Sequence, residues 1–115
     1  MSDRFAAALE RLSRVVGVQG ALVVETEAGV PVATELSTDV DGGAVAALAA
    51  SLYRRAKQAA VTGGMERLET LQLEAEDGHV IVAGAGDVLV IAVTERGAQL
   101  GMVRVEAQRA AESLL

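Results

Sequence analysis

The sequence predicts an α+β fold in which a five-stranded antiparallel sheet lies between one long middle helix and two terminal helices. Apolar residues follow a helical period in three segments, and five shorter apolar segments are bounded by glycine-rich or acidic turns. Two of the five are apolar without interruption, so helices are expected on both faces of the sheet. The predicted order is α-β-β-α-β-β-β-α, within a single domain of residues 1–115.

The first three elements are a helix and a hairpin. Residues 2–16 form an amphipathic pattern whose apolar members are Phe5, Ala8, Leu9, Leu12, Val15 and Val16. The hairpin GALVVETEAGVPVA follows at residues 20–33, with an acidic, glycine-containing turn between two apolar runs. Because proline cannot donate the hydrogen bond that a central strand needs, Pro31 places the second strand at a sheet edge.

A long helix is predicted over residues 43–61, and Gly63-Gly64 ends it. The stripe expected to face the core is Val45, Leu48, Ala49, Leu52, Ala56, Ala59 and Ala60. The other side is unusual, because it carries small residues where a solvated helix carries Lys and Glu. These residues are Ala46, Ala47, Ala50 and Ser51, with Tyr53, Arg54 and Lys57 one turn further along.

Three strands and a helix complete the chain. The run RLETLQLEA, residues 67–75, alternates apolar and polar residues, which is typical of a half-exposed antiparallel strand. The runs HVIVA (residues 79–83) and VLVIAV (residues 88–93) are continuously apolar, as expected of central strands. The last helix, residues 98–115, is expected to bury Leu100, Val103, Ala107, Ala110 and Leu114.

Composition excludes several classes of function. The chain of 115 residues is 51% apolar but only 2% aromatic, has no cysteine, and carries a net charge of −6. An acidic chain disfavours nucleic acid and anionic membranes as partners. The sequence opens without a targeting pattern, and no apolar run approaches the roughly 20 residues of a membrane span. We therefore expect a soluble, cytoplasmic protein.

Catalytic residues are not apparent. The single histidine, His79, stands at the start of a predicted central strand and is interpreted as a packing residue. The carboxylate pairs Glu25 with Glu27 and Glu74 with Glu76 lack the apolar surroundings that separate pKa values for acid–base catalysis. We therefore expect no catalytic residue, and the chain is interpreted as not being an enzyme.

Cofactor and metal sites are not expected either. Asp39 and Asp41, with Glu35 nearby, match no calcium loop and are better explained as helix caps. The run Gly84-Ala85-Gly86 leads into a strand rather than a helix and lacks the lysine of a phosphate-binding loop, so it is interpreted as a hairpin turn.

The remaining signals concern surfaces. The strand of residues 67–75 has no proline or lysine to prevent edge-to-edge pairing. Together with the small side of the helix at residues 43–61, it predicts a symmetric homodimer in which edge strands pair and middle helices pack antiparallel. The candidate interface residues are Ala46, Ala50, Tyr53, Leu71 and Leu73.

Four motifs in this order resemble the roadblock (dynein light chain) family over nearly the full length of the chain. They are GVQGALVVETEAGVPVA, AVAALAASLYRRA, LETLQLEAEDGHVIVAGAGDVLVIAV and LGMVRVEAQRA. The hairpin turn Glu27-Ala28-Gly29 departs from the Asp-Gly turn common in the family. The resemblance implies a roadblock/profilin-like fold and a homodimer whose two sheets join into one.

The resemblance also implies a function, because bacterial members regulate small Ras-like GTPases, as activators or scaffolds, without inserting an arginine. The candidate GTPase-binding residues are Tyr53, Arg54, Lys57 and Gln58. Of the arginines, only Arg96 has the exposed-loop context of an arginine finger, and a turn residue is the simpler interpretation. The alternatives are a purely structural scaffold of a signalling or motor assembly and, less favoured by the 2% aromatic content, a small-molecule sensor.

Overall fold

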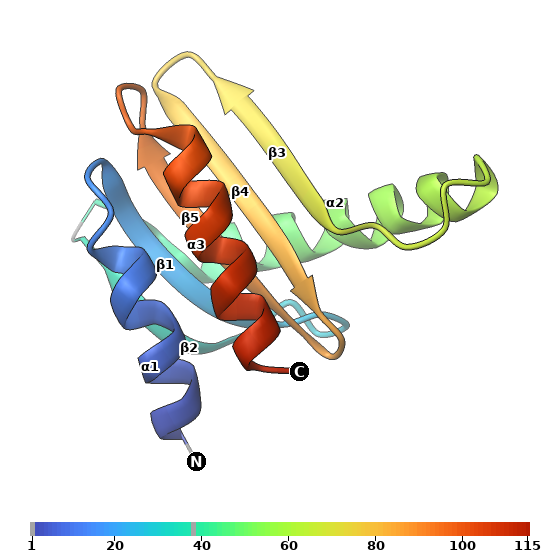
Figure 1. The fold of residues 1–115 in the computed structure, drawn as a ribbon, viewed down its shortest axis with the longest axis horizontal. Coiled ribbons are helices and arrows are strands. Elements are labelled where there is room, and N and C mark those ends of the chain that lie inside the picture. Colours follow the sequence, from blue (N-terminus) through green and yellow to red (C-terminus); the bar gives the residue numbers. More distant parts are fainter. Residues whose placement is uncertain (1, 38) are drawn as a thin grey trace.

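A computed structural model describes residues 2–37 and 39–115 of the chain. The elements are α1 (Ser2–Ser13), β1 (Val18–Glu25), β2 (Pro31–Leu36), α2 (Gly42–Thr62), β3 (Thr70–Ala75), β4 (Gly78–Ala85), β5 (Val88–Glu95) and α3 (Leu100–Ser113). The strands form one antiparallel five-stranded sheet in the order β2-β1-β5-β4-β3 (Figure 1). The predicted element order is confirmed, and so are the positions of β2 and β3 at the two edges.

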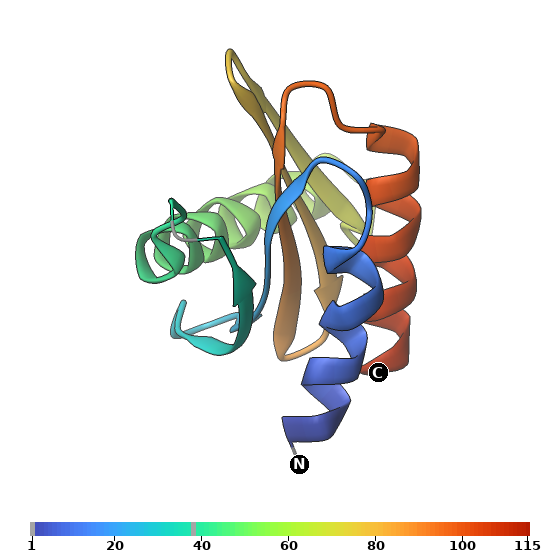
Figure 2. The same cartoon turned by 90° about the vertical axis from the view of Figure 1, so that its left-hand side faces the viewer.

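Helices cover both faces of the sheet, as its continuously apolar strands require. In Figure 2 the sheet is seen nearly edge-on, with α1 and α3 side by side on one face and α2 on the other. The α1–α3 layer buries Leu9, Leu12, Val23, Ile81, Val90 and Val103. The α2 layer buries Leu22, Val24, Val82, Leu89 and Ile91. The predicted division of the three helices between the faces is therefore confirmed.

The side of α2 that faces the sheet, however, differs in part from the sequence prediction, although Ala49 and Val45 lie toward the core as expected. The residues it buries are Ala46, Ala49, Ala50 and Tyr53, whereas Leu48 and Leu52 are 66% and 42% exposed. The physical reason lies in the sheet beneath α2, which supplies its own large side chains, Leu22, Leu89 and Ile91. Against such a surface, small residues on the helix let the two layers close without voids.

The turn between β1 and β2 fits closely against this small side of α2. Gly29 has a φ of +66°, which an L side chain rarely adopts, and a Cβ there would lie 3.2 Å from the Cα of Ala47. Arg54 donates hydrogen bonds from Nη1 to the carbonyl oxygens of Thr26, at 2.8 Å, and Glu27, at 3.2 Å. The arginine therefore ties the turn to the helix.

Tyr53 connects α2 to the opposite edge of the sheet. Its hydroxyl donates a hydrogen bond to the carbonyl oxygen of Leu68, 3.1 Å away, just before β3 begins. The phenol lies against Gly84, where an added Cβ would overlap its oxygen. Burial raises the pKa of Tyr53 above its usual value of 10.0, and the positive charge of Arg67 opposes that rise.

The orientation of α2 is tested by overpacking its two sides. Because Ala46 is fully buried, Ala46→Leu is expected to lower the free energy of unfolding by about 1–3 kcal/mol. Ala44→Leu, on the exposed side, should change it by less than about 0.5 kcal/mol. Urea unfolding followed by circular dichroism measures both. The reverse ranking of the two variants would contradict the orientation.

The raised pKa of Tyr53 has a consequence at high pH. Below pH 10.0 the phenol is protonated in both folded and unfolded chains, so its contribution to stability is fully present. Above that value the unfolded chain loses the proton first, and the contribution is lost as the pH rises through the folded pKa. We therefore expect the free energy of unfolding to fall more steeply as the pH rises above 10.0 in the wild type than in Tyr53→Phe. Equal slopes in urea titrations would contradict the assignment.

Candidate functional site

The sheet face beneath α2 is covered only in part. Side chains directly opposite each other on neighbouring strands share a face, so the register defines two rows on this side. One row consists of Leu22, Ile91, Val82 and Leu71, and all but Leu71 are fully buried. The next row, nearer the β3–β4 turn, consists of Val93, Val80 and Leu73, and none of these is fully buried. The covering layer therefore thins out toward β3.

The path of α2 explains the incomplete cover. The helix packs mainly over β1, β2 and β5, and its C-terminal part extends past β3 and away from the sheet (Figure 1). Its outward side carries Leu48 and Leu52, and Val61 near its end is 60% exposed. Together with Leu73 of β3, which is 37% exposed, these residues define what we call the α2–β3 surface.

The edge of β3 adjoins this surface. Among the described strands, β3 has β4 as its only neighbour, so its outer edge offers unpaired backbone groups. Its sequence, TLQLEA, contains neither proline nor lysine, the residues that most often discourage a second strand from adding to an edge. An open edge beside exposed leucines is a place where another chain can extend the sheet.

The five residues predicted at the dimer interface separate into two groups. Leu71 and Leu73 lie on β3, on the same side of the sheet as α2. Ala46, Ala50 and Tyr53 are instead buried in the core of a single chain, so their assignment to the interface was wrong. The exposed leucines of α2, Leu48 and Leu52, had been assigned to the core, and only the packing reveals that they face outward.

The four residues predicted to contact a GTPase also differ in their surroundings. Tyr53 and Arg54 are engaged within the chain, by the hydrogen bonds to Leu68, Thr26 and Glu27. Lys57 and Gln58 are exposed on α2. Only these two side chains retain their polar groups for a partner.

A depression of about 300 Å³ lies beside Lys57, near the residues that precede β3 and the end of β4. Its walls come from α2, from the segment before β3, from the end of β4 and from the last turns of α3. Two cations, Lys57 and Arg67, and two carboxylates, Glu69 and Glu112, are among its lining residues. This mixed charge suits polar contacts with a protein partner.

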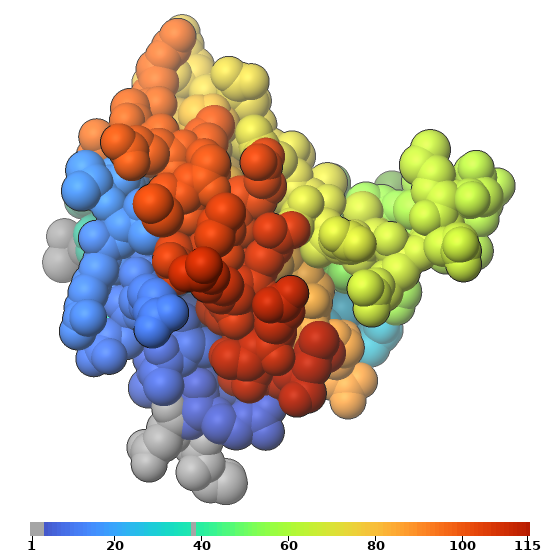
Figure 3. Space-filling view, in the orientation of Figure 1, coloured from blue at the N-terminus to red at the C-terminus, as the bar shows by residue number. Residues whose placement is uncertain are grey.

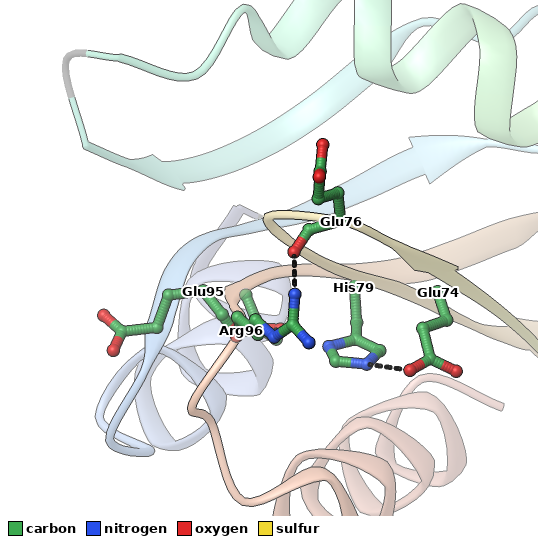
Figure 4. Close-up of polar contacts among 6 residues, drawn as sticks. Glu74, Glu76, His79, Glu95 and Arg96 are labelled. Atoms are coloured by element: carbon green, nitrogen blue, oxygen red, sulfur yellow. Dashed lines mark hydrogen bonds and ion pairs between the residues drawn. The ribbon is translucent and has the colours of Figure 1, made fainter.

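Two residues considered for chemistry have structural roles. His79 is buried, with Nε2 3.8 Å from a carboxylate oxygen of Glu74 on the neighbouring strand (Figure 4). Arg96 donates a hydrogen bond from Nη1 to the carbonyl oxygen of Glu76, 2.9 Å away, and so links the β3–β4 turn to the segment after β5. Both interpretations made from the sequence, a packing histidine and a turn arginine, agree with these contacts.

The described residues, 2–37 and 39–115, contain neither a metal-binding cluster nor a membrane-spanning helix. Within them, His, Asp and Glu side chains form no group of three or more that could hold a metal ion. None of the helices described there has the length and apolar character needed to cross a membrane.

The chain is similar to two uncharacterized proteins of Methanocaldococcus jannaschii. It is 31% identical to MJ1340 and 30% identical to MJ0310, over 106 residues that cover 92% of each protein and 92% of this chain. Their similarity extends over nearly the whole fold described above.

Solved structures give the same fold. The gliding protein MglB of Thermus thermophilus is 25% identical, with a TM-score of 0.84 over 97% of this chain and 86% of that one. A Roadblock/LC7 domain of Streptomyces avermitilis is 19% identical, with a TM-score of 0.81 over 99% of this chain and 93% of that one. The family model of the Roadblock/LC7 domain matches residues 5–95, and the chain belongs to this family.

Proposed function

We propose that this protein is a non-enzymatic homodimer that regulates or scaffolds a small Ras-like GTPase. The observation that carries the proposal is the α2–β3 surface, an exposed apolar face beside an open strand edge on an otherwise acidic molecule. Membership of the Roadblock/LC7 family supports it, because bacterial members of that family are expected to act on such GTPases.

A second copy of the chain is the occupant that fits the α2–β3 surface best. Two copies related by a two-fold axis would pair their β3 edges antiparallel and extend each sheet into the other. The exposed leucines of α2 would then meet across the axis and cover the partly exposed row of Val93, Val80 and Leu73. Full burial of each leucine side chain contributes about 1.5–3 kcal/mol, so a few such residues on each copy would support a stable dimer.

The GTPase would contact residues near the end of α2 that stay exposed in the dimer. Lys57 and Arg67 place two positive charges beside the depression there, and Gln58 is exposed on the same helix. The proposed mechanism uses no inserted arginine, as the resemblance to bacterial roadblock proteins implies, and Arg96 is engaged by the carbonyl oxygen of Glu76. The dimer would instead orient catalytic groups that belong to the GTPase itself.

The dimer interface is tested by placing charges on the α2–β3 surface. Leu48→Glu and Leu73→Arg are expected to give monomers in light scattering, because each would bury an unpaired charge between the two copies. Met102→Glu, which charges an exposed apolar residue on α3 at the opposite face, is the matched control and should leave the dimer intact. A wild-type protein that is monomeric at every concentration, or dimers unaffected by either variant, would contradict the interface.

The GTPase proposal is tested with the small GTPase encoded nearest to this gene, loaded with GTP. We expect binding in calorimetry, a changed rate of phosphate release, and binding at least about fivefold weaker for Lys57→Glu. Arg104→Glu on α3 makes the same change of net charge far from α2 and should bind like the wild type.

The same titration separates the two roles considered for the protein. Binding with a changed hydrolysis rate supports a regulator, whereas binding without any change supports a structural scaffold. If neither Lys57→Glu nor the wild type differs from a buffer control in binding and hydrolysis, the GTPase proposal fails.

A further inference from the structure

A groove of about 500 Å³ lies between α1 and α3, on the sheet face opposite α2. Figure 3 faces this layer and shows α1, in blue, lying along α3, in red. The helices run antiparallel, and Arg4 near the start of α1 donates a hydrogen bond to the carbonyl oxygen of Leu114 after α3, at 2.7 Å. The groove is therefore independent of the α2–β3 surface.

Positive charge is concentrated in this groove. Of the chain's ten Lys and Arg residues, four line it, together with only two of its sixteen Asp and Glu residues. Three of these arginines recur at helical spacing, with Arg4 and Arg11 on α1 and Arg14 directly after it. Since a helix rises 1.5 Å per residue, the row is about 15 Å long, the length of roughly five extended residues.

These guanidinium groups are only partly neutralised within the chain. Arg14 lies 3.5 Å from a carboxylate oxygen of Glu10, but both side chains are about 70% exposed, so this pair is weak. Arg109 lies 3.5 Å from Oε2 of Glu106 and is 62% exposed. Within the described residues the guanidinium of Arg11 has no ion pair or hydrogen bond. The groove thus attracts negative charge on a protein whose net charge is −6.

The carboxylates that line the groove leave most of its positive charge available. Glu106 is only 9% exposed, its Oε1 is buried, and its Oε2 lies beside Arg109. An occupant of the groove would therefore contact the exposed guanidinium groups rather than this carboxylate.

We propose that the α1–α3 groove binds an acidic peptide segment of a partner protein. Such a segment offers carboxylates, which arginine recognises with two parallel hydrogen bonds. About five extended residues would span the row of arginines, so several carboxylates of one segment could contact it at once. Phosphates also accept hydrogen bonds from arginine, so nucleic acid and lipid are the competing occupants in the test.

The test uses a fluorescein-labelled decapeptide of alternating Glu and Ser, measured by fluorescence anisotropy with the full chain. We expect saturable binding that weakens at least about fivefold in Arg11→Glu and less than about twofold in Arg104→Glu. Both arginines are exposed, and the two variants have the same net charge, so a difference between them cannot come from overall charge; circular dichroism checks that both are folded. A decapeptide of alternating Lys and Ser should not bind.

Two other probes test whether a membrane or a nucleic acid, rather than an acidic peptide, binds the groove. Vesicles of phosphatidylcholine with roughly 30% phosphatidylserine and a single-stranded 20-nucleotide DNA are titrated in parallel. Binding of either probe that depends on Arg11, with no binding of the acidic peptide, would overturn the proposal. Equal weakening of peptide binding in Arg11→Glu and Arg104→Glu would also overturn it. The peptide would then be responding to the overall charge of the protein and not to the groove.

Discussion

The structure depends on a mismatch between a five-stranded sheet and the helices available to cover it. Three strands, β1, β5 and β4, are apolar on both sides, so both faces need cover. Two helices, α1 and α3, cover one face side by side, whereas α2 alone crosses the other. A single helix cannot cover five strands, and the uncovered side falls at β3. The surface proposed to make the dimer is therefore a direct result of how the layers are composed.

The alanines of α2 determine which side of this helix faces the sheet and how closely it packs. Because Ala46, Ala49 and Ala50 face the sheet, the helix lies close enough for Gly29 and Arg54 to hold the β1–β2 turn against it. Tyr53 is the one large side chain on that buried side, and it reaches the segment before β3. The leucines are consequently left on the outward side. Tight packing within one chain thus leaves apolar surface for a second chain.

The sequence predicted the element order, the two layers and both edge strands, because strand periodicity, turn residues and Pro31 carry that information locally. It misassigned the sides of α2, since both sides of this alanine-rich helix are apolar and periodicity cannot choose between them. The choice depends on the sheet, where Leu22, Leu89 and Ile91 fill the layer and favour small residues over most of the buried side of α2. The α1–α3 groove was missed for a similar reason: Arg11 and Glu106 are distant in sequence, and only the fold brings their helices together.

Thiol labelling tests the orientation of α2 directly, because the chain has no cysteine of its own. Single variants Ala50→Cys and Leu52→Cys are reacted with a maleimide at low and high protein concentration. We expect Ala50→Cys to react slowly at both concentrations, because residue 50 is fully buried within one chain. Leu52→Cys should react quickly at low concentration and more slowly when the dimer forms. Fast labelling of Ala50→Cys with slow labelling of Leu52→Cys at low concentration would contradict the account.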